Sequence, residues 1–325
     1  MEKRPAYSIN KQLLGLISLA VLVFIVHFFS ASSVLAKDST TTTRFLILVS
    51  KKTPPYLKCE KGVKEVFWKK YKGTFETKSL YLSKEQPGDL KQKIEEFAPS
   101  VAVCIGTRAA FFLKDEEFKF PWVATFLIDK SIESLMAPGL LAVSMDVPIE
   151  RRIETLCRIK NRVRAGLLTY KSPKSSPKRI QTGACKGKDA YYIMSPFFSS
   201  IESALQTLLE EQVDSFFITP DPVIFNSQEA VAYALLWGLR NKVAVCGLSS
   251  GYVKNGALYA LEADIEALGK QAGRLAIARI EGRTSGKTVI EHPQKLILSI
   301  NLKTAKRLGL KIPPDVLNSA QMIIR

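Results

Sequence analysis

The sequence predicts an α/β protein made of two Rossmann-like lobes, each with a mostly parallel sheet. Short, continuous apolar runs, such as RFLILVS at residues 44–50, are typical of strands buried on both faces. Segments with helical periodicity separate these runs, and the connections between them are short. The alternation stops near residues 146–148 and then begins again, which indicates two successive units of similar size.

The first unit contains strands and helices in alternation. The helix at residues 87–97 has a clear start signal, because Pro87-Gly88-Asp89 precedes LKQKIEEF. Strands are predicted at residues 44–50, 76–82, 101–107 and 122–128. Helices are predicted at residues 60–71 and 87–97, and after the third strand through residue 112. We assign residues 37–148 to the first lobe, together with a helix at about residues 265–290.

The second unit repeats the pattern and ends in a short basic helix. Strands are predicted at residues 164–170, 190–195, 214–220, 242–249 and 296–300. Helices are predicted at residues 149–160, 198–212 and 227–240. Residues 171–188 are rich in Ser, Pro, Gly and Lys, so we expect an exposed loop. We assign residues 149–256 to the second lobe, with a closing strand and helix at about residues 295–325, where Pro313-Pro314 prevents the helix from continuing.

The N-terminal segment is typical of a signal peptide. Basic residues precede an apolar run at residues 13–29, and a short segment of small residues ends in Val34-Leu35-Ala36. This pattern predicts cleavage after Ala36 and a periplasmic or secreted protein. An uncleaved membrane anchor is the alternative, although the apolar run is at the short limit for a membrane span.

Charge and cysteine content exclude several protein classes. The net charge is +17, but the basic residues are spread along the chain and form no nucleic-acid-binding motif, so we expect no nucleic acid partner. The five cysteines form no CxxC or metal-ligand spacing, which predicts no metal site. An odd number excludes a complete disulfide framework and leaves a Cys157–Cys185 bridge open.

Catalytic motifs are missing from the sequence. There is no GxSxG or HExxH, and no Cys/His pair with a plausible orienting partner. GRTSGKT at residues 282–288 has one residue too few between its glycines for a phosphate-binding loop, and it follows a helix. We therefore predict a protein that is not an enzyme and needs no cofactor, with a hydrolase using an unrecognised acid pair as the alternative from another class.

The closing segment and the segment before it resemble a known family. NLKTAKRLGLKIP at residues 301–313 and ADIEALGKQAGRLAIARIEG at residues 263–282 resemble ABC-transporter substrate-binding proteins related to tryptophan- and tyrosine-binding components. IGTRAA at residues 105–110 and RAGLLTYKSP at residues 164–173 are also similar to segments of that family. The resemblance extends over most of residues 44–325 and implies the type I periplasmic-binding fold.

Candidate residues for an anionic group follow the third predicted strand. Thr107 can cap the following helix and offer a hydroxyl, and the N–H groups of the first helical turn, including that of Ala109, can hold a carboxylate. Arg108 can add a bidentate contact. Plain helix capping and a solvated arginine are the alternative interpretations of these residues.

Candidate residues for a cationic or aromatic group lie in other loops. Asp129 ends the fourth predicted strand, and Asp221 ends a strand of the second lobe, where it is the preferred partner for a cationic group. Tyr56, placed in the first strand-to-helix loop, can stack on an aromatic ligand. A turn residue is the alternative for Asp129, and a simple loop aromatic is the alternative for Tyr56. Weaker candidates follow the last strand of the second lobe: Ser249, Ser250 and Tyr252.

These observations predict a monomeric, exported protein that binds a small amino-acid-like molecule between its lobes. Ligands of parallel sheets lie beyond the carboxyl ends of the strands, and hinge closure buries them between two such lobes. The family resemblance implies delivery to the permease of an ABC transporter. A ligand-sensing module for a membrane sensor is the alternative, and the identity of the ligand stays open.

Overall fold

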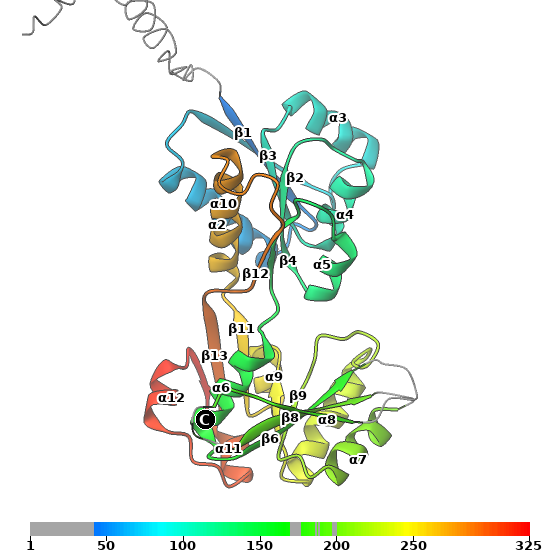
Figure 1. Cartoon of the computed structure of the whole chain (residues 1–325), viewed down its shortest axis with the longest axis vertical. Coiled ribbons are helices and arrows are strands. Elements are labelled where there is room, and N and C mark those ends of the chain that lie inside the picture. The colour runs from blue at the N-terminus through cyan, green and yellow to red at the C-terminus, as the bar shows by residue number, and fades with distance from the viewer. Residues whose placement is uncertain (1–41, 170–176, 186, 188, 197–199) are drawn as a thin grey trace, which may run out of the picture. The chain divides into compact units, whose positions relative to one another are not determined.

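The chain forms two sheets flanked by helices, which confirms the predicted α/β class (Figure 1). The computed structural model describes residues 42–169, 177–185, 187, 189–196 and 200–325. The predicted signal peptide and residues 170–176 lie outside the described residues. Within the described ranges, no helix combines the length and the apolar character needed to cross a membrane.

The first sheet has six strands in the order β12-β5-β4-β3-β1-β2. Neighbours from β12 to β1 pair in parallel, as the alternation of strands and helices predicts. All five residues of β3 are fully buried, as expected for a strand covered on both faces. The strands are β1 (Thr43–Val49), β2 (Phe75–Tyr81), β3 (Val101–Ile105), β4 (Trp122–Leu127), β5 (Leu141–Ser144) and β12 (Val289–Glu291).

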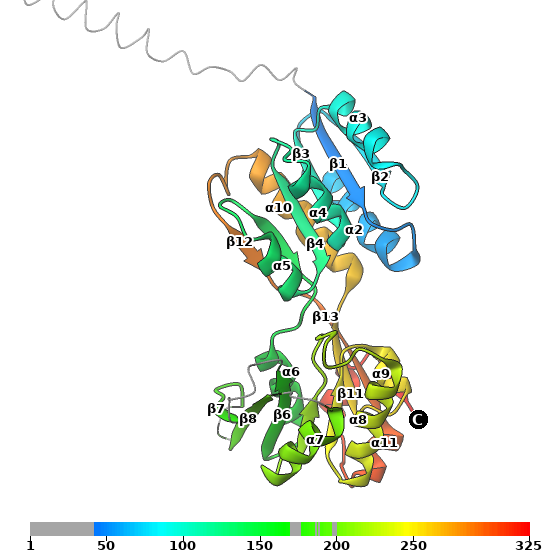
Figure 2. The same cartoon turned by 90° about the vertical axis from the view of Figure 1, so that its right-hand side faces the viewer.

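Helices cover both faces of the first sheet (Figures 1 and 2). On one face, the apolar side chains of three helices pack with the sheet into a single cluster: α3 (Pro87–Phe97), α4 (Thr107–Asp115) and α5 (Asp129–Leu135). The other face carries α2 (Pro54–Lys70) and α10 (Ile265–Ile280). Because α10 follows strand β11 (Tyr259–Ala263) of the second sheet, the polypeptide returns to the first unit before it completes the second sheet.

The α2 and α10 helices touch backbone to backbone at two glycines. A Cβ atom on Gly62 would lie 2.1 Å from the carbonyl oxygen of Glu266, and one on Gly269 would lie 2.0 Å from that of Cys59. Real side chains do not approach this closely, so only glycine fits at these positions. The two glycines therefore determine how closely α10 packs against α2.

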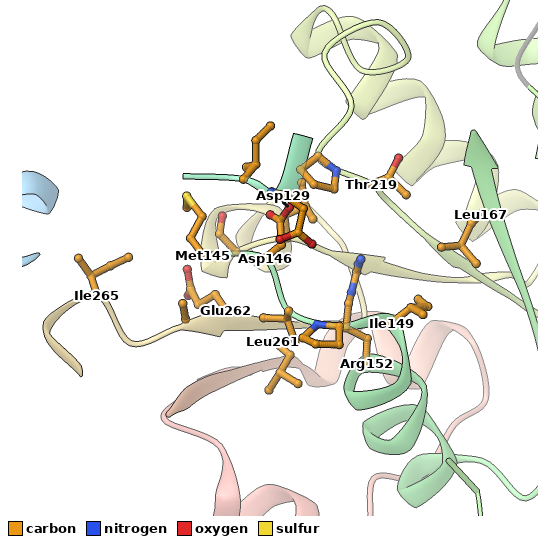
Figure 3. A pocket seen from close by; sticks show the side chains of 17 residues that line it. Asp129, Met145, Asp146, Ile149, Arg152, Leu167, Thr219, Leu261, Glu262 and Ile265 are labelled. Atoms are coloured by element: carbon orange, nitrogen blue, oxygen red, sulfur yellow. Dashed lines mark hydrogen bonds between the residues drawn. The ribbon is translucent and has the colours of Figure 1, made fainter. Parts of the chain in front are cut away.

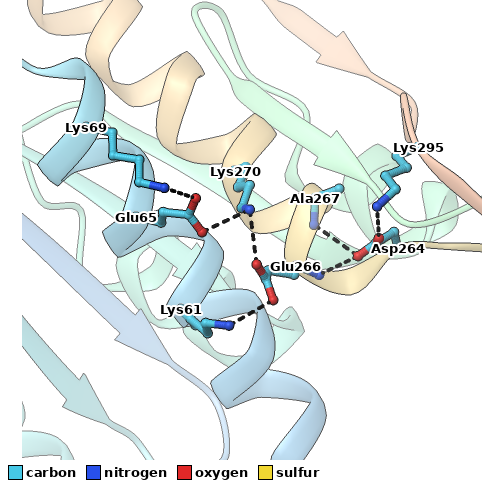
Figure 4. Close-up of polar contacts among 8 residues, drawn as sticks. All are labelled: Lys61, Glu65, Lys69, Asp264, Glu266, Ala267, Lys270 and Lys295. Atoms are coloured by element: carbon cyan, nitrogen blue, oxygen red, sulfur yellow. Dashed lines mark hydrogen bonds and ion pairs between the residues drawn. The ribbon is translucent and has the colours of Figure 1, made fainter.

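Charged residues extend this helix contact on its exposed side (Figure 4). Lys270 Nζ lies 2.9 Å from a carboxylate oxygen of Glu65 and 3.0 Å from one of Glu266, so it bridges the two helices. Lys61 Nζ lies 3.2 Å from the other oxygen of Glu266. Exposed ion pairs each contribute little to stability, about 0.2–1 kcal/mol, so the glycine contact matters more than the charges.

The second sheet has eight strands in the order β14-β13-β11-β10-β9-β6-β8-β7. Its centre is parallel, whereas β13 runs antiparallel to β11, and β7 runs antiparallel to β8. The strands are β6 (Val163–Thr169), β7 (Lys178–Gln181), β8 (Ala190–Pro196), β9 (Ser215–Phe217), β10 (Ala244–Gly247), β11 (Tyr259–Ala263), β13 (Leu296–Asn301) and β14 (Met322–Ile324).

Two apolar clusters lie on opposite faces of the second sheet. One is formed with α6 (Ile149–Ile159), α11 (Leu302–Arg307) and α12 (Pro314–Ser319). The other is formed with α7 (Ile201–Glu210) and α8 (Gln228–Arg240), next to the short helix α9 (Ser250–Lys254). The predicted closing helix is thus α11. The helix ends at Arg307, shortly before Gly309, whose φ of 70° favours glycine. Ala305 packs the helix onto the sheet.

The structure corrects the predicted loop at residues 171–188. Residues 178–181 form β7 and pair with β8, and Cys185 is buried and bonded to Cys157 on α6, with 5.8 Å between the two Cα atoms. β7 is exposed and carries Lys178 and Arg179, so its sequence lacks the apolar alternation that identifies a strand. The strand β5 and helix α5 were also not predicted, because each is too short to show a clear period.

Candidate ligand-binding site

A cavity of about 360 Å³ is lined by residues at the ends of several strands. Its wall includes Leu167 on β6 and the loops that follow β9 and β10, which is the carboxyl edge where parallel sheets bind ligands. The connection from β5 into α6 and the end of β11 complete it (Figure 3). We call it the Arg152 cavity, after the buried cation in its wall.

Arg152 lies in the first turn of α6 and is only 5% exposed. Its Nη2 donates to the backbone carbonyls of Ile218, Cys246 and Gly247 at 3.0, 3.3 and 3.3 Å, and its Cζ lies 4.8 Å from the centre of the Phe217 ring. No carboxylate of the described residues forms an ion pair with it. Burial lowers the pKa of Arg152, but an arginine stays protonated at neutral pH. The cavity wall therefore carries a buried positive charge.

Two aspartates, 17 residues apart in the sequence, line the same cavity. Asp146 follows β5, and its Oδ2 accepts a hydrogen bond of 2.8 Å from the backbone N–H of Asp129, the first residue of α5. The N–H of Asp146 in turn donates to Ser144 Oγ at 3.0 Å. His292 Nδ1 lies 4.0 Å from Asp129 Oδ1. The Asp146 carboxylate is thus held in one orientation, close to a second acid.

The environment of Asp146 changes its proton affinity. Burial raises the pKa of the Asp146 carboxyl to about 6, and the negative charge of Asp129 acts in the same direction. The hydrogen bond from the Asp129 N–H and the charges of His292 and Arg152 oppose the rise. Asp146 is therefore mostly ionised at pH 7, about half protonated near pH 6 and mostly neutral at lower pH.

Two further polar side chains line the cavity. Thr219 follows β9, and its buried Oγ1 has no hydrogen-bond partner among the described residues. Glu262 on β11 accepts a hydrogen bond of 3.0 Å from the N–H of Ser250 at the start of α9. Glu262 thus binds the start of α9, whereas the Thr219 hydroxyl has no hydrogen-bond partner among the described residues.

The rest of the wall is mostly apolar. Ile149 on α6, Leu167 on β6 and Leu261 on β11 line the same cavity as Arg152, and Met145 and Ile265 extend the apolar surface (Figure 3). A few convergent polar groups within an apolar wall are the usual composition of a small-molecule site. This cavity can hold a small molecule that has an apolar part and carries both signs of charge.

The predicted anion-binding residues begin α4 at the end of β3, outside this cavity. Capping by Thr107 was wrong. Gly106 occupies the capping position, with φ 91° and ψ 159°, a conformation that essentially only glycine adopts. The N–H of Ala109 donates to Ser50 Oγ at 2.9 Å, so this donor is already used. Thr107 and Arg108 are exposed.

Of the other predicted residues, Asp129 and the weaker candidate Ser249 line the Arg152 cavity. Tyr56, Asp221, Ser250 and Tyr252 do not. Tyr56 lies in the first turn of α2 and not in a loop, because Pro54 and Pro55 begin the helix. Its ring packs edge-on against Phe126, with 4.8 Å between ring centres. Asp221 Oδ1 accepts the N–H of Val223 at 2.8 Å, and its Oδ2 lies 3.9 Å from Lys130 Nζ.

Arg152 and Asp146 were not identified from the sequence. A signal for Arg152 existed, because positions 149, 152, 153 and 156 lie on one stripe of α6, where the other three are apolar and the arginine is the exception. Its neighbour Arg151 lies off that stripe and is exposed. No comparable signal exists for Asp146, since its partner Asp129 lies 17 residues earlier.

A family model and a curated relative both match this chain. The model described as "ABC transporter substrate binding protein" matches residues 54–324. A tyrosine-binding protein from Clostridioides difficile is 28% identical over 113 residues. That match covers 35% of this chain and 32% of the relative, so it spans about a third of the relative's length.

Solved structures share the fold across both sheets. A ligand-free, open substrate-binding protein with adhesive properties from Clostridium difficile has a TM-score of 0.64 at 15% identity, covering 87% of this chain and 99% of its own. An ABC domain from Streptococcus pneumoniae in complex with L-Trp has a TM-score of 0.52 at 18% identity, covering 87% of this chain and 100% of its own. The fold is the predicted type I periplasmic-binding fold, and with the match over residues 54–324 this chain belongs to the ABC transporter substrate-binding proteins.

Proposed function

We propose that this protein captures a small amino-acid-like molecule in the Arg152 cavity and delivers it to the permease of an ABC transporter. Membership of the substrate-binding family supports capture of a solute as the general activity. The absence of a catalytic motif from the sequence supports binding without chemistry. The amino-acid class and the delivery step go beyond family membership.

The observation that carries the amino-acid class is the pairing of opposite charges in one cavity. Arg152 supplies a buried cation, and Asp129 and Asp146 supply carboxylates at the same cavity. A zwitterion would satisfy both signs, because a buried charge is costly unless an opposite charge or hydrogen bonds compensate it. A volume of about 360 Å³ lies at the small end of ligand sites.

The names of two similar proteins support the same class. One curated relative is a tyrosine-binding protein, and one structural neighbour was solved with L-Trp. Apolar residues such as Ile149, Leu167 and Leu261 give the Arg152 cavity a wall suited to an apolar or aromatic side chain. We therefore place aromatic amino acids first among the candidate ligands.

The residues singled out in the sequence stay part of the proposal as a second set of contacts. Thr107, Arg108, Ala109 and Tyr56 lie at the carboxyl edge of the first sheet, where a second lobe can close on a ligand. Asp221 competes with Asp146 for the role of ammonium receptor. Its carboxylate already faces Lys130, which makes Asp146 the preferred choice.

Export and lobe closure complete the proposed cycle. The signal sequence predicts cleavage after Ala36 and a periplasmic or secreted monomer. Residues 37–148 with about 265–290 form the first proposed lobe, and residues 149–256 with about 295–325 form the second. Hinge closure of the two lobes would bury the ligand and create the form that a permease recognises.

A ligand panel on the purified protein tests the proposal. Thermal unfolding is recorded with each of the twenty amino acids, with purines and with small carboxylates, and titration calorimetry follows for each stabilising compound. A ligand at 100 times its Kd stabilises the folded state by about 2.7 kcal/mol, which a melting curve resolves easily. Stabilisation by aromatic amino acids is expected. Stabilisation by purines alone would exclude the proposed ligand class.

Transport is tested separately from binding. A strain without this gene is expected to lose high-affinity uptake of the identified amino acid. Unchanged uptake together with loss of a transcriptional response to that amino acid would favour the sensing module instead.

A further inference from the structure

We propose that Arg152, the Thr219 hydroxyl and the first turn of α6 together form a receptor for a carboxylate group. The inference rests on the proposed function in that it takes the ligand to be a small solute bound in the Arg152 cavity. It adds which groups recognise the solute and which chemical feature they select.

The first argument is that no carboxylate of the described residues forms an ion pair with Arg152, although the more distant charge of Asp146 acts on it. The side chain is 95% buried, since 5% is exposed, and its nearest polar partners are three backbone carbonyls. Only Nη2 takes part in those three bonds, so most of the guanidinium fork is not used by them. Carbonyl dipoles solvate a cation only in part, whereas a carboxylate matches the fork geometry of arginine and neutralises its charge.

The second argument is the Thr219 hydroxyl. Thr219 lies next to Ile218, whose carbonyl binds Arg152, and both Thr219 and Arg152 line the same cavity. In the described part of the chain, Thr219 Oγ1 has no hydrogen-bond partner although it is buried. A buried polar atom of this kind is uncommon and costly in native proteins. After rotation of the Thr219 side chain toward the cavity, a ligand oxygen held by Arg152 would give this hydroxyl an acceptor.

The third argument is the start of α6, an eleven-residue helix that no side chain caps at its N-terminus. Pro148 and Ile149, the residues at this end, line the cavity. Unpaired N–H groups and the helix dipole favour an anion at this position. A buried cation, a hydroxyl without a partner in the described residues and an uncapped helix start thus belong to residues that line one cavity.

The acids in the same cavity select the kind of anion. Asp129, Asp146 and Glu262 also line it, so a dianion such as phosphate would be repelled more than a monoanion. A carboxylate that belongs to a zwitterion meets the cation at one end and the acids at the other. The receptor should therefore distinguish an amino acid from the amine that lacks its carboxylate.

The test compares two amino acids, the two amines that lack their carboxylate and the two acids that lack their amino group, on three proteins. Calorimetry measures L-tyrosine, L-tryptophan, tyramine, tryptamine, 3-(4-hydroxyphenyl)propionate and indole-3-propionate against the wild type, Arg152→Met and Arg151→Met. Arg151 is the control, because it precedes Arg152 on α6 but its side chain is 60% exposed and 3.5 Å from Glu154. Circular dichroism confirms that each variant is folded.

We expect the wild type and Arg151→Met to bind the amino acids at least about 30-fold more tightly than the amines, because loss of one partner of a buried charge contact costs about 2 kcal/mol or more. Arg152→Met should bind amino acids and amines with similar, weak affinity. If Arg152→Met weakens the binding of amino acids and of amines equally, Arg152 only holds the loops together, and the inference is overturned.

Failure of the proposed function gives a different pattern. If only the two propionates bind, in an Arg152-dependent manner, the carboxylate receptor stands and the amino-acid class is wrong. If the amines bind the wild type as tightly as the amino acids do, the receptor is wrong and a cationic ligand remains. Absence of binding by any carboxylate counts against both. Should Arg152→Met fail to fold, Arg152→Lys keeps the charge without the fork, and unchanged discrimination of at least about 30-fold in that variant would show that the fork is not required.

Discussion

The carboxyl edges of the two sheets differ in how far the polar groups at the helix starts are paired within the protein. At the first edge, where β1, β3 and β4 end, one N–H at the start of α4 is paired within the protein. Ser50 Oγ accepts the N–H of Ala109 at 2.9 Å, and the Tyr56 ring covers Gly106. At the second edge, where β6, β9 and β10 end, Arg152 and Thr219 keep unused hydrogen-bonding capacity within a cavity.

The difference shows that the position of a polar residue at a strand end does not make it a binding residue. The decisive property is whether its donors and acceptors are already paired inside the protein. Thr107 and Arg152 both lie in the first turn of a helix that follows a strand or its connection. Thr107 is exposed to water, whereas Arg152 is buried and hydrogen-bonded to carbonyls, with no carboxylate of the described residues at ion-pair distance.

The largest effect is expected from Gly106→Ala, which tests how tightly the first edge is closed. A Cβ atom there would lie 2.6 Å from the Tyr56 ring and 2.8 Å from Ser50 Oγ, and φ is 91°. Strain and overpacking together should lower the free energy of unfolding by about 3 kcal/mol, measured by urea denaturation. Gly88→Ala is the control, since its new Cβ meets nothing within 4 Å. Equal stability of the two variants would mean that the first edge is open.

The next effect compares Asp146→Asn with Asp221→Asn in ligand affinity. Asparagine keeps the acceptor for the Asp129 or Val223 N–H and removes only the charge. If Asp146 receives the ammonium group, its variant should bind about 30-fold more weakly, while Asp221→Asn changes Kd less than about threefold because Lys130 already faces Asp221. The reverse order, read by calorimetry, would support the residue chosen from the sequence alone.

The sequence predicted most strands and helices, because local composition determines them. The apolar runs of β1, β3 and β4 are almost entirely buried, as continuous hydrophobic strands in parallel sheets should be. The closing helix α11 could also be predicted, since its apolar face and Gly309 are local signals. β7 could not, because its charged residues form a strand only by pairing with β8.

The binding cavity was harder to predict because its groups come from distant segments. Asp129 was found, since it directly follows an apolar strand. Asp146 gains its role only when β5 pairs with β4 and brings the two aspartates together. Arg152 could have been found from its place on the apolar stripe of α6. The guanidinium of Arg152 is positioned by hydrogen bonds to backbone carbonyls at the ends of β9 and β10, and no local sequence pattern predicts these contacts.

A smaller effect is expected from pH, through Asp146. Its pKa is raised from 3.8 to about 6 in the folded protein, so the folded state binds the proton more tightly than the unfolded state between these values. Stability contributed by the protonated carboxyl is therefore lost as pH rises from about 4 to 6. Removing the charge with Asp146→Asn should raise the free energy of unfolding at pH 7.5 by roughly 1 kcal/mol, after allowance for solvent screening.

The control for this prediction is the same pair of proteins at pH 4, where Asp146 is protonated and the two stabilities should agree. Urea denaturation at half-unit pH steps gives the profile. A constant difference across the whole range would show that the substitution acts through packing and not through the charge near Asp129, His292 and Arg152.

The smallest effect is expected from Thr219→Val compared with Thr107→Val, and it should change stability and ligand affinity in opposite directions. Thr219→Val removes a buried hydroxyl that has no partner in the described structure, so the ligand-free protein should gain about 0.5–1 kcal/mol in its free energy of unfolding. The same change should weaken ligand binding by about three- to tenfold, because the carboxylate loses a donor. Thr107→Val, at an exposed site, should alter both quantities by less than about 0.5 kcal/mol. Urea denaturation and calorimetry measure the two quantities on the same samples. A Thr219→Val protein that is both less stable and unchanged in affinity would show that the hydroxyl supports the fold and does not contact the ligand.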